Sequence, residues 1–470
     1  MNTDLVQIGG FEAAVPTPEN GKTFYIETFG CQMNVHDSEK VAGVLAARGY
    51  RQVPSHEDAD LIFYNTCSIR EKAVNKVFSR LGAFQQEDRK QQKILAVLGC
   101  VAQHEGEKLF RRAPQVRLIC GSASYRDLPE LIRRLEEGER RVTGLSLDVD
   151  ECFETEITRR DNPYRAYLTI IEGCDKSCAY CVVPMTRGPE RSRASHKILE
   201  ECGRLTGEGF TEIQLLGQNV NSYRDPSPAR RSFAELLGRV ADVEGVRRVR
   251  FTTSHPRDFH PEIVAAIDSH PALCGHVHLP VQSGSTRVLR AMRRDYSREE
   301  YLEKIYCIRR AKRAISITTD LIVGFPGETV KDFEETLTLL DEVGYDSAFS
   351  FKYSPRPQTS ALGLGDPVAE EEKGRRLGIL LDRQQSIQLK RNRAFVGHEY
   401  EVLVETWQKR TGQLSGRTGS NRVVNFAGSP ELRGRYVTVR LTRANPNSFV
   451  GEMIQASRAE SRGASAWKSK

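Results

Sequence analysis

Three cysteines lie close together in one short stretch of the chain, EGCDKSCAYC, as Cys174, Cys178 and Cys181. A metal site that only stabilises a fold closes with four protein ligands, whereas a catalytic site leaves one position for water or substrate. The C-x3-C-x2-C pattern supplies three thiols and no fourth, so it predicts a metal centre with one position open. A substrate or a cofactor would bind at that position.

Structural zinc is the plain alternative for this group of cysteines. Zinc sites of that kind combine two C-x2-C pairs, and the sequence contains no second pair downstream of Cys181. Iron–sulfur clusters, in contrast, use local runs of cysteine ligands. The pattern therefore favours an iron–sulfur centre.

Three further cysteines each end a predicted strand: Cys31 after KTFYIETFG, Cys67 after ADLIFYNT and Cys100 after KILAVLG. Helix-like stretches separate these strands, and the alternation predicts a parallel sheet with crossover helices. Ligands bind at the carboxyl ends of the strands in such sheets, so we expect the three thiols to meet there. The alternative is three unrelated buried cysteines, because free cysteine packs well as a small hydrophobe. Cys120 also ends a strand, VRLI, and is interpreted as a packing residue.

The elements that must position these cysteines form an α/β protein of three parts. Residues 22–145 are the predicted parallel α/β domain. Residues 160–388 repeat the strand–helix alternation about six times, which predicts a partial (β/α)6 barrel with its active site at the carboxyl mouth. Residues 390–456 contain short strands broken by Gly, Asn and Pro, which predict a small OB-like β-barrel. The polar tail, 457–470, is predicted to be disordered.

Length and composition fit this division. A chain of 470 residues exceeds one ordinary core, so about two to four domains are expected. The sequence is 39% hydrophobic and 28% charged, and it has no apolar run long enough to span a membrane. The start of the chain has neither a basic residue before Lys22 nor an apolar signal core, so we expect no presequence and a cytoplasmic protein. In that compartment, 11 cysteines indicate thiolate ligands more than disulfides.

Positive charge is concentrated near the carboxyl terminus. From residue 388 onward there are 15 Lys and Arg against 6 Glu and no Asp, a net charge of +9 in a chain whose total is +7. This asymmetry favours nucleic acid as a partner.

The cysteine loop after the first barrel strand resembles the signature of the radical S-adenosylmethionine (SAM) superfamily, in which Tyr180 also occupies the usual aromatic position before the last cysteine. The resemblance implies that Cys174, Cys178 and Cys181 hold a 4Fe-4S cluster whose fourth iron binds SAM. One electron from the cluster then cleaves SAM to methionine and a 5′-deoxyadenosyl radical.

Two other stretches are similar to SAM-binding parts of that superfamily, and a third contains arginines that could bind an anion. LIVGFPGE resembles the loop beside the adenine, where Gly324 and Gly327 would let backbone approach the cofactor, although an ordinary turn is the alternative. LLGQN, residues 215–219, resembles a polar motif that binds the SAM amino group, and a turn is again the alternative. The arginines of TRGPERSR either bind carboxylate or phosphate or are solvated: Arg187, Arg191 and Arg193.

The order of the three parts resembles the methylthiotransferases, in which the last part is an RNA-binding TRAM domain, and the likeness covers nearly all of residues 22–455. GCQMNVHDSEKVAGVL, SAFSFKYSPRP and GRTGSNRVVNF are most similar to the branch that modifies C2 of N(6)-(dimethylallyl)adenosine in tRNA, next to the anticodon. The alternatives are the branches that modify a threonylcarbamoyl-adenosine in tRNA or an aspartate of a ribosomal protein.

The family resemblance also implies cofactors and partners. A second, auxiliary 4Fe-4S cluster on Cys31, Cys67 and Cys100 would carry the sulfur that one SAM methylates, while another SAM supplies the radical. The partners implied are tRNA, whose anticodon-loop bases can be splayed into a pocket, and a reducing electron donor. The sulfur donor stays unknown and no membrane is expected. Four arginines of the last part are expected to contact tRNA phosphates: Arg417, Arg422, Arg433 and Arg435.

Two hypotheses from other classes remain at this stage. One is a non-catalytic iron–sulfur protein that binds RNA. The other is a radical SAM enzyme that acts on a protein side chain, although a basic terminal β-barrel fits an RNA substrate better.

Overall fold

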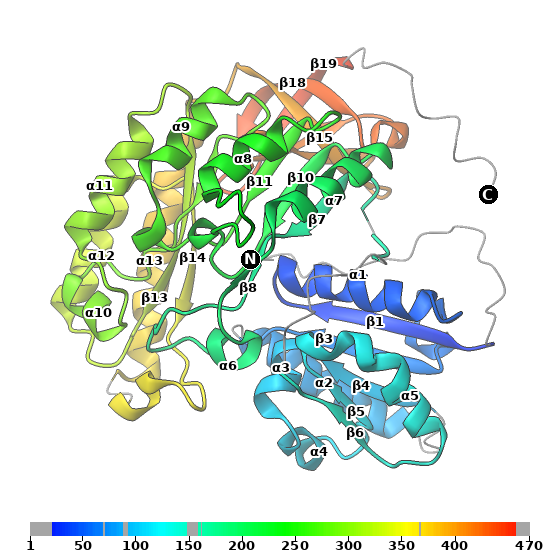
Figure 1. Cartoon of the computed structure of the whole chain (residues 1–470). Helices are drawn as coiled ribbons and strands as arrows, with labels where there is room; N and C mark the ends of the chain where they lie inside the picture. The colour runs from blue at the N-terminus through cyan, green and yellow to red at the C-terminus, as the bar shows by residue number, and fades with distance from the viewer. Residues whose placement is uncertain are drawn as a thin grey trace.

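The computed structural model of the chain describes residues 21–68, 71–87, 93–147, 158–160, 162–365 and 368–456. These residues form three bodies that follow one another along the chain, as Figure 1 shows: a sheet with helices on both faces, a partial barrel and a small closed barrel. The expected disordered tail, 457–470, and the start of the chain, 1–20, lie outside the described residues. Within the described part, no helix has the length and apolar character that crossing a membrane requires.

The amino-terminal body is a parallel sheet of six strands in the order β2-β1-β3-β4-β5-β6. The strands are β1 (Thr23–Phe29), β2 (Arg51–Gln52), β3 (Leu61–Thr66), β4 (Ile94–Leu98), β5 (Leu118–Cys120) and β6 (Val142–Gly144). Helices α1 (Gln32–Ala46) and α5 (Leu128–Glu136) pack on one face. Helices α2 (Glu71–Glu87), α3 (Gly99–Glu105) and α4 (Lys108–Arg112) pack on the other. The predicted parallel sheet is confirmed.

In the central strands of this sheet, successive apolar side chains point to opposite faces and are buried on both, which explains why the sheet forms between two layers of helices. In β3, Leu61 and Phe63 pack against one helical layer, whereas Ile62 and Tyr64 pack against the other. A strand that is buried on both faces is a nearly continuous apolar run. Polar residues and cysteines therefore come mainly where these strands end, at their carboxyl edge.

The central body contains six parallel strands in chain order: β7 (Arg165–Thr169), β10 (Glu212–Leu216), β11 (Arg248–Phe251), β12 (His276–His278), β13 (Ser316–Val323) and β14 (Ser347–Lys352). Two three-stranded sheets are joined by a parallel bridge between Val249 and Leu273. The barrel stays open between β14 and β7, as the count of six units predicted. Its helices are α7 (Ser195–Gly207), α8 (Phe233–Ala241), α9 (Pro261–Ser269), α10 (Thr286–Ala291), α11 (Arg298–Arg309), α12 (Val330–Val343) and α13 (Glu370–Arg393).

Three of these helices begin at capping boxes that are visible in the sequence. In each, the first side chain accepts a hydrogen bond from a backbone N–H three residues on, and the later carboxylate accepts one in return. The pairs are Ser232 with Glu235, Ser297 with Glu300 and Thr329 with Asp332. These caps fix where α8, α11 and α12 start.

The carboxyl-terminal body is a closed barrel of five strands in the order β15-β16-β17-β19-β18. The strands are β15 (Glu399–Gln408), β16 (Gln413–Thr418), β17 (Val423–Ala427), β18 (Tyr436–Ala444) and β19 (Phe449–Ala456). Its core is made of alternate strand residues such as Val402, Leu414 and Phe426. The predicted small β-barrel is confirmed.

The small barrel packs against the amino ends of the first three central strands. Tyr164, just before β7, donates a hydrogen bond to the Glu405 carbonyl. Arg247 and Arg248, at the start of β11, bind the Glu401 carboxylate at 3.0 Å each. The mouth at the carboxyl ends is thus left to the amino-terminal body, which lies on the other side of the barrel in Figure 1.

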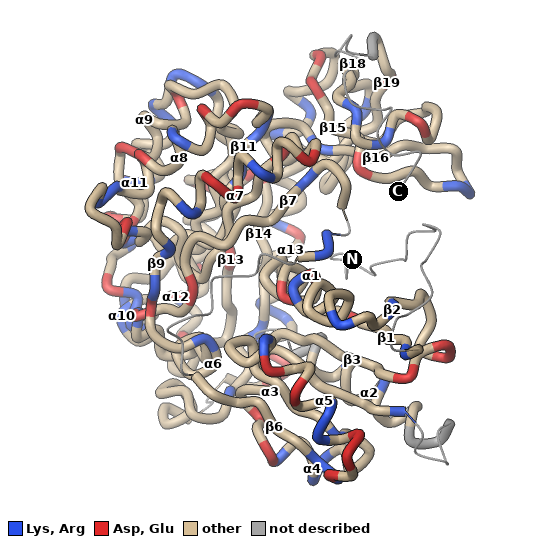
Figure 2. The backbone as a smooth tube through the Cα atoms, turned by 45° about the vertical axis from the view of Figure 1, so that its right-hand side comes forward, with Lys and Arg blue, Asp and Glu red and all other residues tan. Residues whose placement is uncertain are grey.

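Arg422 also binds the central body, just before β14 and at the end of α13, so its expected role in phosphate binding is wrong. Its guanidinium is buried and donates to the Asp346 carboxylate at 2.6 Å and to Asn392 at 2.9 Å. Although burial works against the charge of Asp346, Arg422 and Arg391 hold the pKa of this carboxyl below its usual value. Basic and acidic residues are interspersed in all three bodies, as Figure 2 shows. Many of the arginines, like Arg422, form ion pairs with carboxylates of the same chain.

Replacing Arg422 with alanine should lower the free energy of unfolding by about 3 kcal/mol, because Asp346 loses a buried partner. Denaturant unfolding followed by the fluorescence of Trp407, which lies in β15, measures the change. Arg440→Ala is the control, since its ion pair with Glu399 is exposed and should contribute less than about 1 kcal/mol. Equal effects of the two substitutions would contradict the role given to Arg422.

Candidate functional site

Cys31, Cys67 and Cys100 follow three strands that are adjacent in the sheet, β1, β3 and β4. Cys31 is the residue before α1, Cys67 directly follows β3, and Cys100 is the second residue of α3. The sheet reverses its winding direction between β1 and β3, the position where ligands bind in doubly wound folds. We call these three residues the N-terminal triad.

The N-terminal triad contains an activated thiol. A hydrogen bond with Cys67 lowers the pKa of Cys31 to about 6, against the opposing effect of burial. Asn34 lies 3.3 Å from the Cys31 sulfur through its Oδ1 atom. Because the thiolate is the form that binds metals, this environment suits a metal ligand.

Cys174, Cys178 and Cys181, the barrel triad, lie in a loop that a short antiparallel ribbon closes. The ribbon pairs β8 (Ile171–Glu172) with β9 (Arg191–Ser192), and the loop contains the short helix α6 (Val183–Arg187). The Cys174 N–H donates to the Gly188 carbonyl at 3.2 Å. Gln218 accepts a hydrogen bond from the Gly173 N–H at 2.6 Å, so the LLGQN motif holds this loop in place. The loop follows β7 and therefore lies at the barrel mouth.

Three of the six cysteines directly follow a glycine, a signal that the sequence analysis did not use. Gly30, Gly99 and Gly173 have φ values of +147°, +81° and +76°. A Cβ at Gly99 would lie 2.4 Å from the Asn65 side chain, and one at Gly173 would lie 1.9 Å from the Pro189 carbonyl. Only glycine permits both the backbone angle and the close approach. Paired Gly-Cys positions could have indicated where the chain turns tightly to present a thiol.

The donor atoms of both triads fit iron–sulfur clusters. Each triad offers sulfur and no carboxylate or imidazole, which is the ligand set that such clusters use. Burial raises the pKa of Cys174 to about 11 and that of Cys181 to about 12, so binding at these residues must displace their protons. Within the described residues, no three His, Cys, Asp or Glu side chains are arranged to hold a metal ion by themselves.

Unpartnered polar atoms surround the N-terminal triad. The hydroxyls of Thr66, Ser68 and Tyr125 are buried and have no hydrogen-bond partner in the part of the chain that the structure describes, although buried polar groups nearly always have one. Thr66 and Ser68 flank Cys67 in the chain. Burial raises the pKa of Tyr125, and the nearby charge of Asp37 adds to this effect while that of Arg187 opposes it. Such atoms fit a site whose remaining polar partner is a bound group.

The amino-terminal body docks on the barrel mouth next to its triad. Met33 and Val35 of α1 pack with Tyr167 and Leu216 of the barrel, and Cys31 contacts the same cluster. Two ion pairs flank this contact, Lys40 with Glu172 at 3.4 Å and Arg160 with Glu39 at 3.8 Å. The N-terminal triad therefore faces the mouth that also holds the barrel triad.

One sulfur of each triad accepts a hydrogen bond from a buried arginine. Arg187 donates from Nε to the Cys100 sulfur at 3.4 Å, and Arg294 donates to the Cys178 sulfur at the same distance. From the sequence, Arg187, Arg191 and Arg193 are expected either to bind carboxylate or phosphate or to be solvated. All three bind carboxylates of this chain: Asp37, Glu172 and Glu201, respectively.

The glycine loop after β13 lies against the barrel triad. Phe325 packs with Ala179, which stands between two of the cysteines. The Glu328 carboxylate accepts hydrogen bonds from the Gly324 and Phe325 N–H groups and thereby closes the loop. The space beside Gly324 is filled by Lys373, whereas Gly327 has no atom closer than 4.0 Å to the position of a Cβ.

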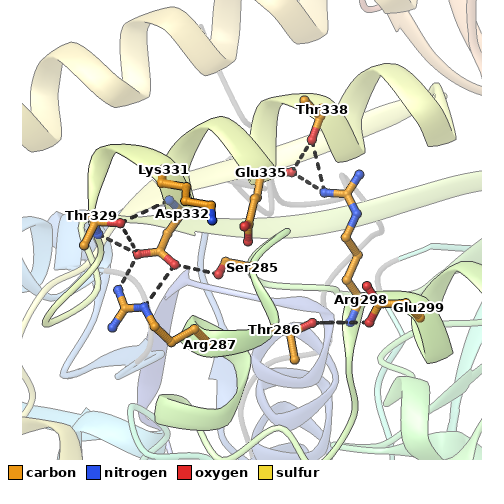
Figure 3. Close-up of a pocket in the computed structure, with 10 residues that line it drawn as sticks. All are labelled: Ser285, Thr286, Arg287, Arg298, Glu299, Thr329, Lys331, Asp332, Glu335 and Thr338. Carbon is orange, nitrogen blue, oxygen red and sulfur yellow. Dashed lines mark hydrogen bonds and ion pairs between the residues drawn. The ribbon is translucent and has the colours of Figure 1, made fainter.

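A cleft of about 490 Å³ on the outer side of the barrel is separate from both triads. Figure 3 shows that Asp332, at one end of the cleft, accepts hydrogen bonds from Arg287 and Ser285. No cysteine of either triad lines it. We assign it no function.

Comparisons with known proteins match each body separately. Residues 23–121 match the uncharacterized protein family UPF0004, residues 168–340 match the radical SAM superfamily, and residues 393–454 match the TRAM domain. Among solved structures, the radical S-adenosylmethionine methyltransferase TsrM from Kitasatospora setae aligns with a TM-score of 0.52 and 14% identity. The alignment covers 72% of this chain and 73% of that one, and it shows a shared fold.

Curated relatives match nearly the whole chain. The tRNA-2-methylthio-N(6)-dimethylallyladenosine synthase of Solibacter usitatus is 63% identical over 437 residues, which are 92% of this chain and 98% of that protein. The enzyme of the same name from Koribacter versatilis is 58% identical over 94% of this chain and 100% of its own length. The enzyme of that name from Aquifex aeolicus is 44% identical over 92% of this chain and 99% of its own length.

Substituting Cys100 with alanine should remove about half of the bound iron from anaerobically reconstituted protein, because one ligand of the N-terminal triad is lost. Cys120→Ala is the matched control. The Cys120 thiol is fully buried and donates to the Gly121 and Ser124 carbonyls, both at 3.4 Å, and not to the triad. Iron analysis and the visible absorption spectrum give the result. Loss of iron from the Cys120 variant, with retention in the Cys100 variant, would show that the wrong third ligand was chosen.

Proposed function

Because the chain belongs to the family of tRNA-2-methylthio-N(6)-dimethylallyladenosine synthases, we propose that its two cysteine triads hold the two clusters of the reaction. The protein is a radical SAM transferase that adds a methylthio group to C2 of N(6)-(dimethylallyl)adenosine in tRNA, next to the anticodon. Its cofactors are 4Fe-4S clusters and SAM. We assign Cys174, Cys178 and Cys181 to the cluster that binds SAM, and Cys31, Cys67 and Cys100 to the auxiliary cluster.

The observation that carries this assignment is the meeting of both triads at one barrel mouth. Cys31 packs on the barrel strands through Tyr167 and Leu216, while Arg187 of the barrel loop touches Cys100. C2 of an adenine is an unactivated C–H position, so its substitution needs the radical that a reduced cluster generates from SAM. We propose that these contacts bring the base, SAM and both clusters together at this mouth.

The loop after β13 supports SAM binding beside the barrel triad. Its backbone is fixed by Glu328, which Arg376 binds in turn at 3.3 Å. We propose that Gly324 and Gly327, whose φ values of +72° and +79° shape the turn, place this backbone next to the cofactor. SAM would then lie between the cysteine loop and the end of β13.

An aromatic pair on β14 is suited to hold the base. Phe349 and Phe351 are 38% and 39% exposed, whereas Ala348, which precedes Phe349 in the strand, packs against the core of the central body. The His278 ring lies 6.1 Å from the Phe349 ring on the same inner face. We propose that this pair, which lies in the SAFSFKYSPRP motif, contacts the adenine and its dimethylallyl group.

The remaining assignments follow the three bodies. We propose that residues 22–145 are the methylthiotransferase domain, 160–388 the radical SAM core and 390–456 the TRAM domain, in a cytoplasmic protein supplied by a reducing electron donor. Since the small barrel docks through buried contacts such as that of Arg422, only its exposed arginines are available to tRNA phosphates. Arg433 and Arg435 are exposed and form no ion pair within the described residues.

A strain that lacks the gene and is complemented with a triad variant tests the function. We expect tRNA from cells with the wild-type chain to contain the 2-methylthio nucleoside, and tRNA from cells with Cys178→Ala or Cys67→Ala to accumulate the dimethylallyl precursor. Mass spectrometry of tRNA nucleosides measures both. If the wild-type chain instead added the methylthio group to threonylcarbamoyl-adenosine, the substrate assignment would be contradicted.

Purified protein separates the roles of the two triads. Cys67→Ala should still produce 5′-deoxyadenosine from SAM under reducing conditions, whereas replacing Cys174, Cys178 and Cys181 together should abolish it. Chromatographic detection of 5′-deoxyadenosine decides. If the triple variant still cleaves SAM, the assignment of the SAM site is wrong.

Substituting Arg433 and Arg435 together with alanine should weaken tRNA binding and flatten its salt dependence. Each phosphate contact contributes roughly 0.7 to 0.9 to the slope of log affinity against log salt, so the slope should fall by about 1.5. Filter binding at several salt concentrations measures it. The double substitution of Arg133 and Arg134 on α5, whose partners are Glu130, Glu137 and Glu139, is the control for lost charge. If the variant that lacks Arg433 and Arg435 kept the same salt slope, these two arginines would not contact tRNA phosphates.

A further inference from the structure

Arg187 connects the two bodies at the N-terminal triad. It ends α6, in the loop that also contains the barrel triad, yet its guanidinium lies in the amino-terminal body. Two of its nitrogens donate to the two carboxylate oxygens of Asp37, at 3.3 and 2.5 Å, and its Nε donates to the Cys100 sulfur at 3.4 Å. The exposed fraction is 6% for Arg187 and 1% for Asp37.

The geometry separates two roles within one side chain. The forked end of the guanidinium is fixed by Asp37 in a bidentate pair, which leaves Nε aimed at the sulfur. Arginine keeps its charge at all physiological pH values, so the sulfur always has a cationic donor beside it. A lysine could not make both contacts with one rigid group.

A cationic donor at a ligand sulfur favours the more negative, reduced state of an iron–sulfur cluster. Hydrogen bonds to the sulfurs, net charge and solvent exposure are the means by which proteins set the reduction potential of these clusters. Groups that contact ligands also orient them and tune the metal. Arg187 supplies a hydrogen bond and a buried positive charge at the same point.

We propose that Arg187 is a positioning residue that raises the reduction potential of the cluster on Cys31, Cys67 and Cys100. Because it comes from the barrel, this potential depends on the docking of the two bodies. The inference rests on the ligand assignment proposed above and adds to it a residue outside the ligand set. Arg294 has the corresponding position at Cys178 in the barrel triad, where its other contacts are Tyr296 and the Pro280 carbonyl.

A purely structural salt bridge is the competing explanation for Arg187. Arg160 is a matched case, because its side chain is also buried at this contact and binds Glu39 and Glu201, and it donates no hydrogen bond to a cysteine among the described residues. If Arg187 acted only by joining the two bodies, its loss and that of Arg160 should affect the cluster alike.

The test uses the full-length chain with only the N-terminal cluster assembled, on the background in which Cys174, Cys178 and Cys181 are alanine. The midpoint potential is measured by redox titration followed by electron paramagnetic resonance. Arg187→Met should lower it, Arg187→Lys should lower it less because the charge is kept, and Arg160→Met should leave it unchanged. An unchanged potential in Arg187→Met with full iron content, or an equal shift in Arg160→Met, would overturn the proposal.

Arg187→Met leaves Asp37 buried without its partner, so a second variant guards against simple misfolding. Arg187→Met with Asp37→Leu removes both charges and should assemble the cluster at a lowered potential. Failure of this double variant to bind iron would instead establish a structural role. On the background with Cys31, Cys67 and Cys100 replaced, Arg294→Met should lower the potential of the barrel cluster, while Arg187→Met should not.

The same measurements distinguish this inference from the proposed function. If the N-terminal triad does not bind a cluster, the background protein shows no iron–sulfur signal before any arginine is changed. If the triad binds a cluster but Arg187 does not tune it, the signal is present and its potential does not move.

Discussion

Arg187 leaves the cysteine loop of the barrel and ends beside Cys100 and Asp37 in the neighbouring body, where neither charged side chain is more than 6% exposed. Burying such a pair is favourable only if the geometry satisfies both groups, and losing one partner is costly. The bidentate contact and the packing of Met33 and Val35 on the barrel therefore fix how the two bodies meet. The position of each triad relative to the other depends on this contact.

Both triads use the same property of parallel sheets. The carboxyl ends of parallel strands lie at one edge, so residues that follow successive strands become neighbours although they are distant in sequence. In the amino-terminal body this edge gathers Cys31, Cys67 and Cys100, and in the barrel it is the mouth where the cysteine loop begins. The small barrel packs on the amino ends of the central strands, so it does not cover the mouth where the two triads lie.

Sequence patterns predicted the elements well and the partners of charged residues poorly. Apolar runs and capping boxes such as Ser297 with Glu300 are local, so the sheet, the partial barrel and the small barrel could be predicted from them. Arg422 was expected to bind phosphate, yet it binds Asp346 of the barrel, which is 76 residues away in the chain. No local pattern could have shown this, because an exposed and a buried arginine have the same sequence context.

The sequence alone determined which residues are available as ligands, since cysteine spacing is a covalent property of the chain and the C-x3-C-x2-C loop needs no other segment to exist. It also determined the three bodies, because hydrophobic periodicity is a local property. Only the tertiary structure decided that the two triads meet at one mouth and that Arg187 and Arg294 each donate a hydrogen bond to one of their sulfurs. Those contacts arise from packing between strands and bodies far apart in sequence, where burial and charge pairing, rather than local preference, select the partner.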